Sequence, residues 1–228
     1  MSENDFCTTD LIQSIRDYQE HHRVLMEKSH HFVFDCPLNY DTKDCKPDYI
    51  FLGINPGSDA SDWVRTNNKN AEETRDSNFQ LDFSRSPNSK SRMTKLKNFL
   101  GQDTFNKTTH TELFFWCSNN IGMDFKKRYG HNYESSPYLE FCIKMNKKLI
   151  DRVNPKAIFL ESESNIPLIS KFFKLEVKKI HKTQTRKVTE YIFDNKYLLL
   201  NFDHLSAGPP ASLERKDVSA IIKQIVNK

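Results

Sequence analysis

Uninterrupted apolar runs alternate along the chain with segments of helical periodicity, and this alternation predicts an α/β fold. Strands that are covered on both faces of a sheet are apolar throughout, as four short runs are. These runs are residues 49–52, 113–116, 157–160 and 197–200. Apolar positions at helical spacing predict helices over residues 10–28, 136–152, 166–173 and 213–226. We therefore expect a three-layer αβα sandwich around a central, mainly parallel four-stranded sheet.

Residues 1–228 are predicted to form a single domain, since α/β domains commonly reach about 200 residues before they split. An N-terminal helical extension covers about residues 1–46, and a polar insertion covers about residues 58–95. A loop as long as this insertion is usually either functional or disordered. Residues 175–194 alternate well enough to predict a hairpin with a basic tip at residues 181–187.

Composition narrows the function classes. The apolar share of 37% is low, but 17 Phe residues supply enough bulk for a core. The net charge of +4 is too small to identify a nucleic-acid partner, so the positions of the charges matter more than their sum. The chain lacks the long apolar run of a membrane span, and its start is too polar for a signal peptide. Five widely spaced cysteines without a Cys-x-x-Cys pair suit reduced thiols in the cytoplasm.

Two polar, turn-rich loops follow predicted strands and carry the clearest candidate chemistry. They are residues 53–57 (Gly-Ile-Asn-Pro-Gly) and residues 201–210. The carboxyl ends of parallel strands share one sheet edge, so Asn55 and His204 are predicted to face a common cleft. An amide holds a water molecule by accepting its hydrogen bond, and a histidine donates a hydrogen bond to charge on a leaving group. Taken alone, each motif also fits an ordinary turn or a loop histidine.

In their order and spacing, these motifs resemble the uracil-DNA glycosylase superfamily. Residues 53–57 are similar to the G-x-N-P-G water-positioning loop of its mismatch-specific and single-strand-selective branches. Residues 137–160, which begin with Pro-Tyr-Leu, resemble its helix and third strand, and residues 204–206 (His-Leu-Ser) resemble its H-P-S loop. The likeness spans about residues 47–212. It implies a monofunctional DNA glycosylase, which hydrolyses the N-glycosidic bond of a flipped base and leaves an abasic site.

The resemblance also implies a role for each motif residue. Asn55 would position the attacking water, and His204 would hydrogen-bond the departing base. Leu205 would act as a wedge in the base stack of the DNA. The two motifs would supply four further substrate-binding positions. Two of them, Gly57 and Ser206, would lie against phosphates of the DNA. The four positions are Gly53, Ile54, Gly57 and Ser206.

No cofactor is expected. Members of the superfamily with an iron-sulfur cluster need four spaced cysteines, one of them just before the Pro-Tyr-Leu segment. This chain has Ser135 and Ser136 there. We therefore expect neither an iron-sulfur cluster nor a metal ion, and a monomer that acts on DNA in the cytoplasm without a membrane partner.

The identity of the target base depends on Glu112. Members that read uracil place an asparagine near the second strand, and Glu112 aligns with that position. A carboxylate accepts hydrogen bonds from an amino group, as on cytosine, but does not donate to the carbonyl that uracil presents there. The alternative is that Glu112 is a surface or salt-bridged residue and that Asn119 or Asn120 reads the base.

Small and acidic residues after the first motif favour a bulky, hydroxylated base. Asp59 and Asp62, followed by the polar insertion, leave room for a large substituent and acceptors for its hydroxyl groups. The superfamily includes a defence branch that excises glucosylated hydroxymethylcytosine from phage DNA, and these residues are compatible with it. The alternatives are a repair glycosylase for uracil or mismatched thymine and a DNA-binding module without catalysis.

Overall fold

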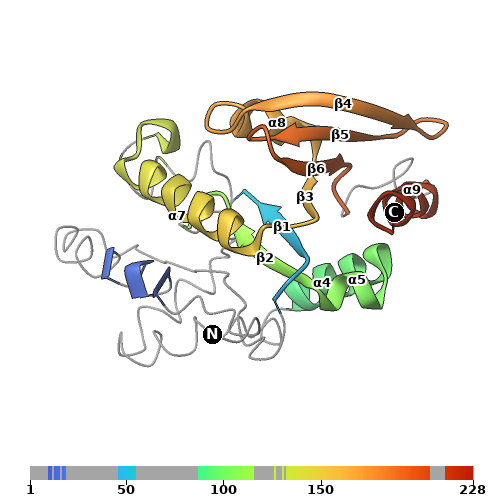
Figure 1. Cartoon of the computed structure of the whole chain (residues 1–228), viewed down its shortest axis with the longest axis horizontal. Helices are drawn as coiled ribbons and strands as arrows, with labels where there is room; N and C mark the ends of the chain where they lie inside the picture. Colours follow the sequence, from blue (N-terminus) through green and yellow to red (C-terminus); the bar gives the residue numbers. More distant parts are fainter. Residues whose placement is uncertain are drawn as a thin grey trace. The chain divides into compact units, whose positions relative to one another are not determined.

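The computed structural model describes residues 10–11, 13–15, 17–18, 46–54, 87–115, 126, 130, 132–205 and 214–227, with residues 87–93 described by their backbone. These residues form an α/β structure with a six-stranded mixed sheet (Figure 1). The strands are β1 (Tyr49–Gly53), β2 (Thr108–Glu112), β3 (Ala157–Glu161), β4 (Leu175–Lys182), β5 (Lys187–Phe193) and β6 (Tyr197–Phe202). The helices are α4 (Pro87–Leu100), α5 (Gln102–Asn106), α7 (Pro137–Val153), α8 (Ile166–Ile169) and α9 (Arg215–Val226), with 3-10 turns η1 (Tyr133–Ser135) and η2 (Glu163–Asn165).

The strand order of the sheet is β2-β1-β3-β6-β5-β4. Strand β3 is parallel to both β1 and β6, as the buried apolar runs predict. The predicted four-stranded sheet is wrong in its strand number, because the hairpin formed by β4 and β5 joins the same sheet. Strand β5 pairs antiparallel with β6, and Figure 1 shows β4, β5 and β6 as neighbours.

The second predicted strand is displaced along the chain. An apolar run predicts a strand over residues 113–116, whereas β2 ends at Glu112. The residues of β2 alternate polar and buried positions, so periodicity gives little sign of them. The backbone beyond β2 still pairs, since the N–H groups of Leu113 and Phe114 donate to the carbonyls of Gly53 and Ile54, each over 2.9 Å. The predicted run is therefore the continuation of the strand rather than the strand itself.

The described chain divides into two compact units, each assembled from separate segments. The first unit contains residues 1–44, 53–82 and 110–152, and the second contains residues 45–52, 83–109 and 153–228. The boundary passes through β1, β2 and the end of α7, so both units use parts of these elements.

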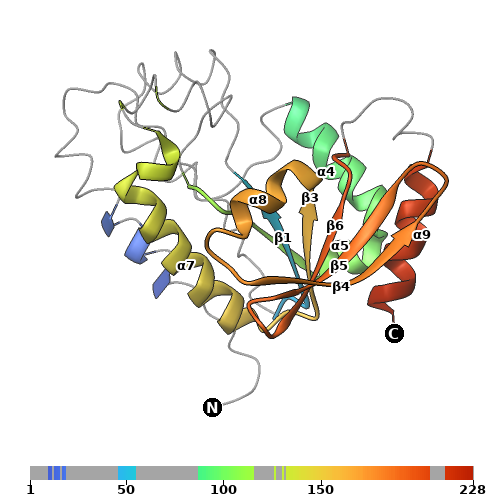
Figure 2. The ribbon, with the colours of Figure 1, turned by 90° about the horizontal axis from the view of Figure 1, so that it is seen from above.

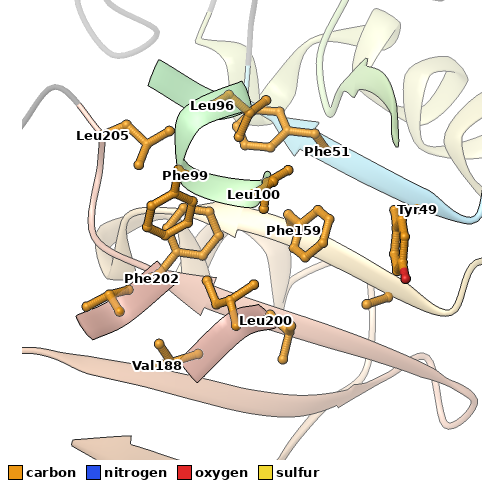
Figure 3. Close-up of a cluster of buried hydrophobic side chains, with 13 residues drawn as sticks. Tyr49, Phe51, Leu96, Phe99, Leu100, Phe159, Val188, Leu200, Phe202 and Leu205 are labelled. Carbon is orange, nitrogen blue, oxygen red and sulfur yellow. The ribbon is translucent and has the colours of Figure 1, made fainter. Parts of the chain in front are cut away.

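The core of the second unit lies between its strands and the helices α4 and α9. Phe51, Phe159 and Leu200 form a row across β1, β3 and β6, because the strand register pairs them directly. Phe99 of α4 lies 4.8 Å from Phe202, measured between ring centroids (Figure 3). Helix α9 contributes buried apolar residues to the same cluster and lies beside β5 in Figure 2. This packing fixes the carboxyl ends of β3 and β6.

Helix α4 was not expected from the sequence. The polar insertion predicted over residues 58–95 overlaps it, since α4 begins at Pro87. The part of the insertion that precedes the helix lies outside the described residues. Helices α7 and α9 confirm the predicted helices over residues 136–152 and 213–226, and α8 covers the first half of the predicted helix over residues 166–173.

In the first unit, the N-terminal helical residues pack on α7. The ring of Tyr18 stacks on Phe141 with 3.7 Å between centroids. Asp10 forms a bidentate ion pair with Arg152, and this hydrogen-bonded pair lowers the pKa of Asp10 to about 2. Residues 10–18 thus confirm the start of the predicted helix over residues 10–28 in their described part. No helix within the described ranges combines the length and apolar character that crossing a membrane requires.

Candidate active site

The structure describes part of the predicted site. Gly53, Ile54 and Glu112 are described in the first unit, and His204 and Leu205 in the second. Several predicted residues lie outside the described residues, as do four of the five cysteines. These predicted residues are Asn55, Gly57, Asp59, Asp62 and Ser206, together with the alternative base readers Asn119 and Asn120.

The side chain of Glu112 lies directly against Gly53. A Cβ atom added to Gly53 would lie 1.8 Å from Oε2 of Glu112. The carboxylate therefore fills the space beside the glycine. Gly53 ends β1 without the positive φ found at Gly101 and Gly130, so close packing is the feature that excludes a side chain here.

Glu112 is buried, with 3% of its surface exposed. Its Oε1 lies 3.1 Å from Nε2 of His110, whose side chain is also largely buried. Its Oε2 has no hydrogen-bond partner among the described residues. A buried carboxylate oxygen without a donor is costly, because nothing replaces its hydration. The alternative prediction that Glu112 is a surface residue is therefore wrong. The alternative that it is a salt-bridged residue is compatible with its contact with His110.

The backbone that carries Glu112 is fixed by Asn146, a residue of α7 that sequence analysis missed. The Asn146 side chain is 1% exposed and donates to the carbonyls of Glu112 (3.0 Å) and Leu113 (3.2 Å). It also donates to Cys142 and accepts a hydrogen bond of 2.9 Å from Thr111. An asparagine at an apolar position of an amphipathic helix was the signal that could have identified it. Its full set of partners joins the helix to the end of β2.

In the second unit, His204 lies beside a second buried carboxylate that the sequence analysis also missed. Nε2 of His204 is 3.3 Å from Oε2 of Glu161, the last residue of β3. The Glu161 side chain is 4% exposed, whereas that of His204 is 46% exposed. An acidic residue directly after the apolar run Ala-Ile-Phe-Leu was the available signal. The pair places an imidazole at the carboxyl edge of the parallel strands, where α/β sheets bind ligands.

Leu205 occupies a packing position. It is 2% exposed and belongs to the apolar cluster that includes Phe99 and Phe202 (Figure 3). A wedge has to present an exposed side chain to the base stack. In the conformation described here, Leu205 instead anchors the start of the loop after β6 in the core.

The basic tip of the predicted hairpin carries ion pairs with neighbouring carboxylates. Nε of Arg186 lies 3.4 Å from Asp203, and Nζ of Lys187 lies 2.5 Å from Glu163. These pairs reduce the positive charge that the sequence assigned to the tip. Within the described part of the chain, no group of three or more His, Cys, Asp and Glu side chains is placed to hold a metal ion.

Comparison with known proteins identifies no family. The chain matches none of the protein-family models, and a search of curated proteins also finds no match. The functional interpretation therefore depends on the residues of the site.

Proposed function

We propose that this protein is a DNA glycosylase that hydrolyses the N-glycosidic bond of a flipped, modified cytosine. Glucosylated hydroxymethylcytosine in phage DNA is the proposed target, and an abasic site is the product. The observation that carries the proposal is the buried carboxylate of Glu112, which lies against Gly53 of the first motif with Oε2 lacking a donor among the described residues.

Glu112 supports recognition of an amino group. An ionised carboxylate only accepts hydrogen bonds, so its unpartnered oxygen is matched by a ligand that donates one. The exocyclic amino group of cytosine donates, whereas the carbonyl at the same position of uracil accepts. If uracil occupied this position, its carbonyl and the carboxylate would both be acceptors, so no hydrogen bond would form between them. Recognition through Glu112 therefore favours cytosine and its derivatives over uracil and thymine.

The chemistry assigns complementary roles to Asn55 and His204. As the C1′–N bond breaks, positive charge develops on the sugar and negative charge on the base. Asn55 accepts a hydrogen bond from the attacking water and orients it toward C1′. His204 donates a hydrogen bond to the departing base and so stabilises its charge. The half-exposed ring of His204, held at the sheet edge, is compatible with contact to a substrate.

The substituent and the DNA backbone are assigned to the flanking segments. Asp59 and Asp62 accept hydrogen bonds from the sugar hydroxyls of the modified base. Gly57 and Ser206 allow the phosphates to approach, which positions the DNA without reading its sequence. Flipping the nucleotide costs a few kcal/mol in a duplex, so these backbone contacts also hold the extruded conformation.

Base release from defined DNA substrates tests the proposal. The full-length protein is incubated with DNA containing glucosylated hydroxymethylcytosine, with unmodified DNA and with uracil-containing DNA. We expect base release and abasic sites in the first alone. E112Q should lower kcat/KM for the modified cytosine at least about tenfold, because a contact to the wrong hydrogen-bonding group costs about 1–3 kcal/mol. E140Q, an exposed substitution on α7, serves as the control.

The same assay separates the other functions. Efficient uracil release by the wild type would contradict the role of Glu112 and favour a repair glycosylase. N55A should abolish base release and leave DNA affinity nearly unchanged, because the amide acts on water rather than on the phosphates. A wild-type protein that binds DNA but releases no base from any of these substrates would favour a DNA-binding module.

A further inference from the structure

The hairpin of β4 and β5 reaches past the carboxyl end of β6, and the roles proposed above do not use its basic tip. Strand β5 runs antiparallel to β6 with Thr189 opposite Asn201, so the residues before β5 lie level with the loop after β6. Nε of Arg186 is 3.4 Å from Oδ2 of Asp203, the residue directly before His204. The tip therefore lies beside the second motif, within the second unit.

The turn between β4 and β5 is held by its own hydrogen bonds and by Glu214. The backbone N–H of Thr183 donates to the carbonyl of Arg186 over 2.8 Å, and that of Arg186 donates to the Thr183 hydroxyl over 2.9 Å. Glu214 accepts hydrogen bonds from the hydroxyls of Thr183 and Thr185 and from the backbone N–H of Thr185 (3.0 Å). The backbone that carries Arg186 is thus positioned before any ligand binds.

Arg186 carries more hydrogen-bond donors than its neighbours use. Its side chain is 27% exposed, and within the described part of the chain only its Nε faces a carboxylate, that of Asp203. The terminal nitrogens Nη1 and Nη2 retain their N–H donors, and a guanidinium keeps its charge because it does not deprotonate in proteins. The other carboxylates near the turn are engaged, since Glu163 pairs with Lys187 and Glu214 accepts from the threonines. The unused donors require an anionic acceptor from outside this cluster.

A phosphate group of DNA matches these donors. A guanidinium binds two phosphate oxygens at once through a pair of N–H groups, a geometry that a lysine does not offer. Asp203 holds the Nε side of the guanidinium, so the terminal nitrogens are the pair that a phosphate would contact. Lys182 adds positive charge beside the turn, because it is exposed and forms no ion pair with the described residues. The tip thus presents cations to a ligand, although its net charge is small.

We propose that Arg186 binds a phosphate of the DNA backbone next to the flipped nucleotide. This inference rests on the proposed function, from which it takes DNA as the ligand and the second motif as the place of the flipped nucleotide. The contact positions the DNA without reading its sequence. Because Asp203 joins the hairpin to the residue before His204, the contact fixes the DNA backbone beside the loop that carries the imidazole.

Fluorescence anisotropy with an unmodified DNA duplex tests the contact without relying on base release. R186Q removes the guanidinium, and we expect about tenfold weaker binding at about 0.1 M salt, because a hydrogen bond to a charged group is lost. The plot of log Kd against log salt concentration should become shallower by about 0.9, the change expected for one phosphate.

K174Q is the matched control, since it removes one exposed positive charge from the other end of the same hairpin. Lys174 precedes β4, whose eight residues separate it from the turn by roughly 26 Å. This separation exceeds the Debye length of about 10 Å at 0.1 M salt. K174Q should therefore change neither the affinity nor its salt dependence, and equal effects of K174Q and R186Q would overturn the proposal.

D203N separates a ligand contact from a structural ion pair. R186Q and D203N break the same ion pair, but only R186Q removes the proposed phosphate contact. D203N also removes a negative charge near the DNA, so its affinity should stay within about threefold of the wild type or exceed it. A comparable loss of affinity in both variants would overturn the proposal, as would wild-type affinity in R186Q.

Kinetics on the modified DNA connect the contact to the proposed function. R186Q should raise KM about tenfold and change kcat less than about threefold, because a phosphate contact is made equally in the ground state and the transition state. Base release by R186Q with a wild-type KM would overturn the phosphate contact and leave the glycosylase function standing. Weaker and less salt-dependent binding by R186Q, in a protein that releases no base, would support the contact and overturn the glycosylase function.

Discussion

The carboxylate of Glu112 occupies the space that a side chain at residue 53 would need. In G53A, the new Cβ would lie 1.8 Å from Oε2, far inside van der Waals contact. Because Glu112 is buried, moving its carboxylate away from the new Cβ would disturb the packing around it. We expect this overpacking to lower the free energy of unfolding by about 1–3 kcal/mol, as measured by urea denaturation.

A double-mutant cycle identifies the source of that cost. E112A removes the carboxylate, so G53A introduced into this background should cost much less than in the wild type. We expect a coupling of about 1 kcal/mol or more between the two positions. Additive effects of G53A and E112A would show that the glycine is required for another reason, such as its backbone conformation.

At the scale of single residues, sequence patterns identified several residues that lie at strand ends, but they did not identify the buried polar residues that contact them. Gly53 and His204 were recognised because each stands in a motif, and Glu112 because it aligns with the base-reading position of the family that the chain resembles. Glu161 and Asn146 stand in no motif, and their importance follows from partners far along the chain: His204 lies 43 residues from Glu161, and Thr111 lies 35 residues from Asn146. Pairs of this kind form only through tertiary structure.

At the scale of elements, periodicity predicted helices and uninterrupted strands but not the assembly of the sheet. Strands β1, β3 and β6 are apolar because both of their faces are covered. The hairpin of β4 and β5 was predicted as a hairpin, yet a local pattern does not show which strand a hairpin will pair with. Most residues of β4 are exposed, consistent with its place at the edge of the sheet.

The tip of this hairpin is connected to α9 by an acid-sensitive contact. Glu214, next to the start of α9, accepts hydrogen bonds from the hydroxyl groups of Thr183 and Thr185 and from the backbone N–H of Thr185 (3.0 Å). These bonds lower the pKa of Glu214 from 4.5 to about 2. Because the folded state has the lower pKa, the stabilisation is fully present above pH 4.5 and is lost as the pH falls toward 2.

We therefore expect E214Q to be less sensitive to acid than the wild type. The difference in melting temperature between the two proteins should shrink as the pH is lowered from about 5 to about 2. Asp10 also has a lowered pKa, but it is present in both proteins and cancels in the comparison. E176Q on the exposed face of β4 controls for the loss of one negative charge. A constant difference across this range would contradict the role of Glu214.

At the scale of the molecule, the two compact units are interleaved in the sequence. The chain passes between them five times, at residues 44/45, 52/53, 82/83, 109/110 and 152/153. Three of these passages cut through β1, β2 and α7. Secondary structure is cooperative, since each hydrogen bond depends on the conformation of its neighbours. Strand β2 is divided into residues 108–109 and 110–112, so loss of one unit would shorten a strand that the other unit also uses.

Two spectroscopic probes can test whether the units unfold together. Hydrogen exchange at the backbone N–H groups of Leu113 and Phe114, which donate to Gly53 and Ile54, reports on the first unit when it is followed by NMR at increasing urea concentrations. The far-ultraviolet circular dichroism signal includes the contributions of β3 to β6 and α9 of the second unit. The shared elements predict one cooperative transition, with the same urea midpoint for both probes.

Separate midpoints would be informative, because the order of the transitions identifies the weaker unit. Loss of exchange protection in the first unit at lower urea would show that β1 and β2 can end at the boundary without unfolding the second unit. The chain, which its length predicts to be a single domain, would then unfold in two separate transitions. We expect the two midpoints to coincide in the wild type. In G53A they should still coincide, at a lower urea concentration, because residue 53 ends a strand whose other residues belong to the second unit.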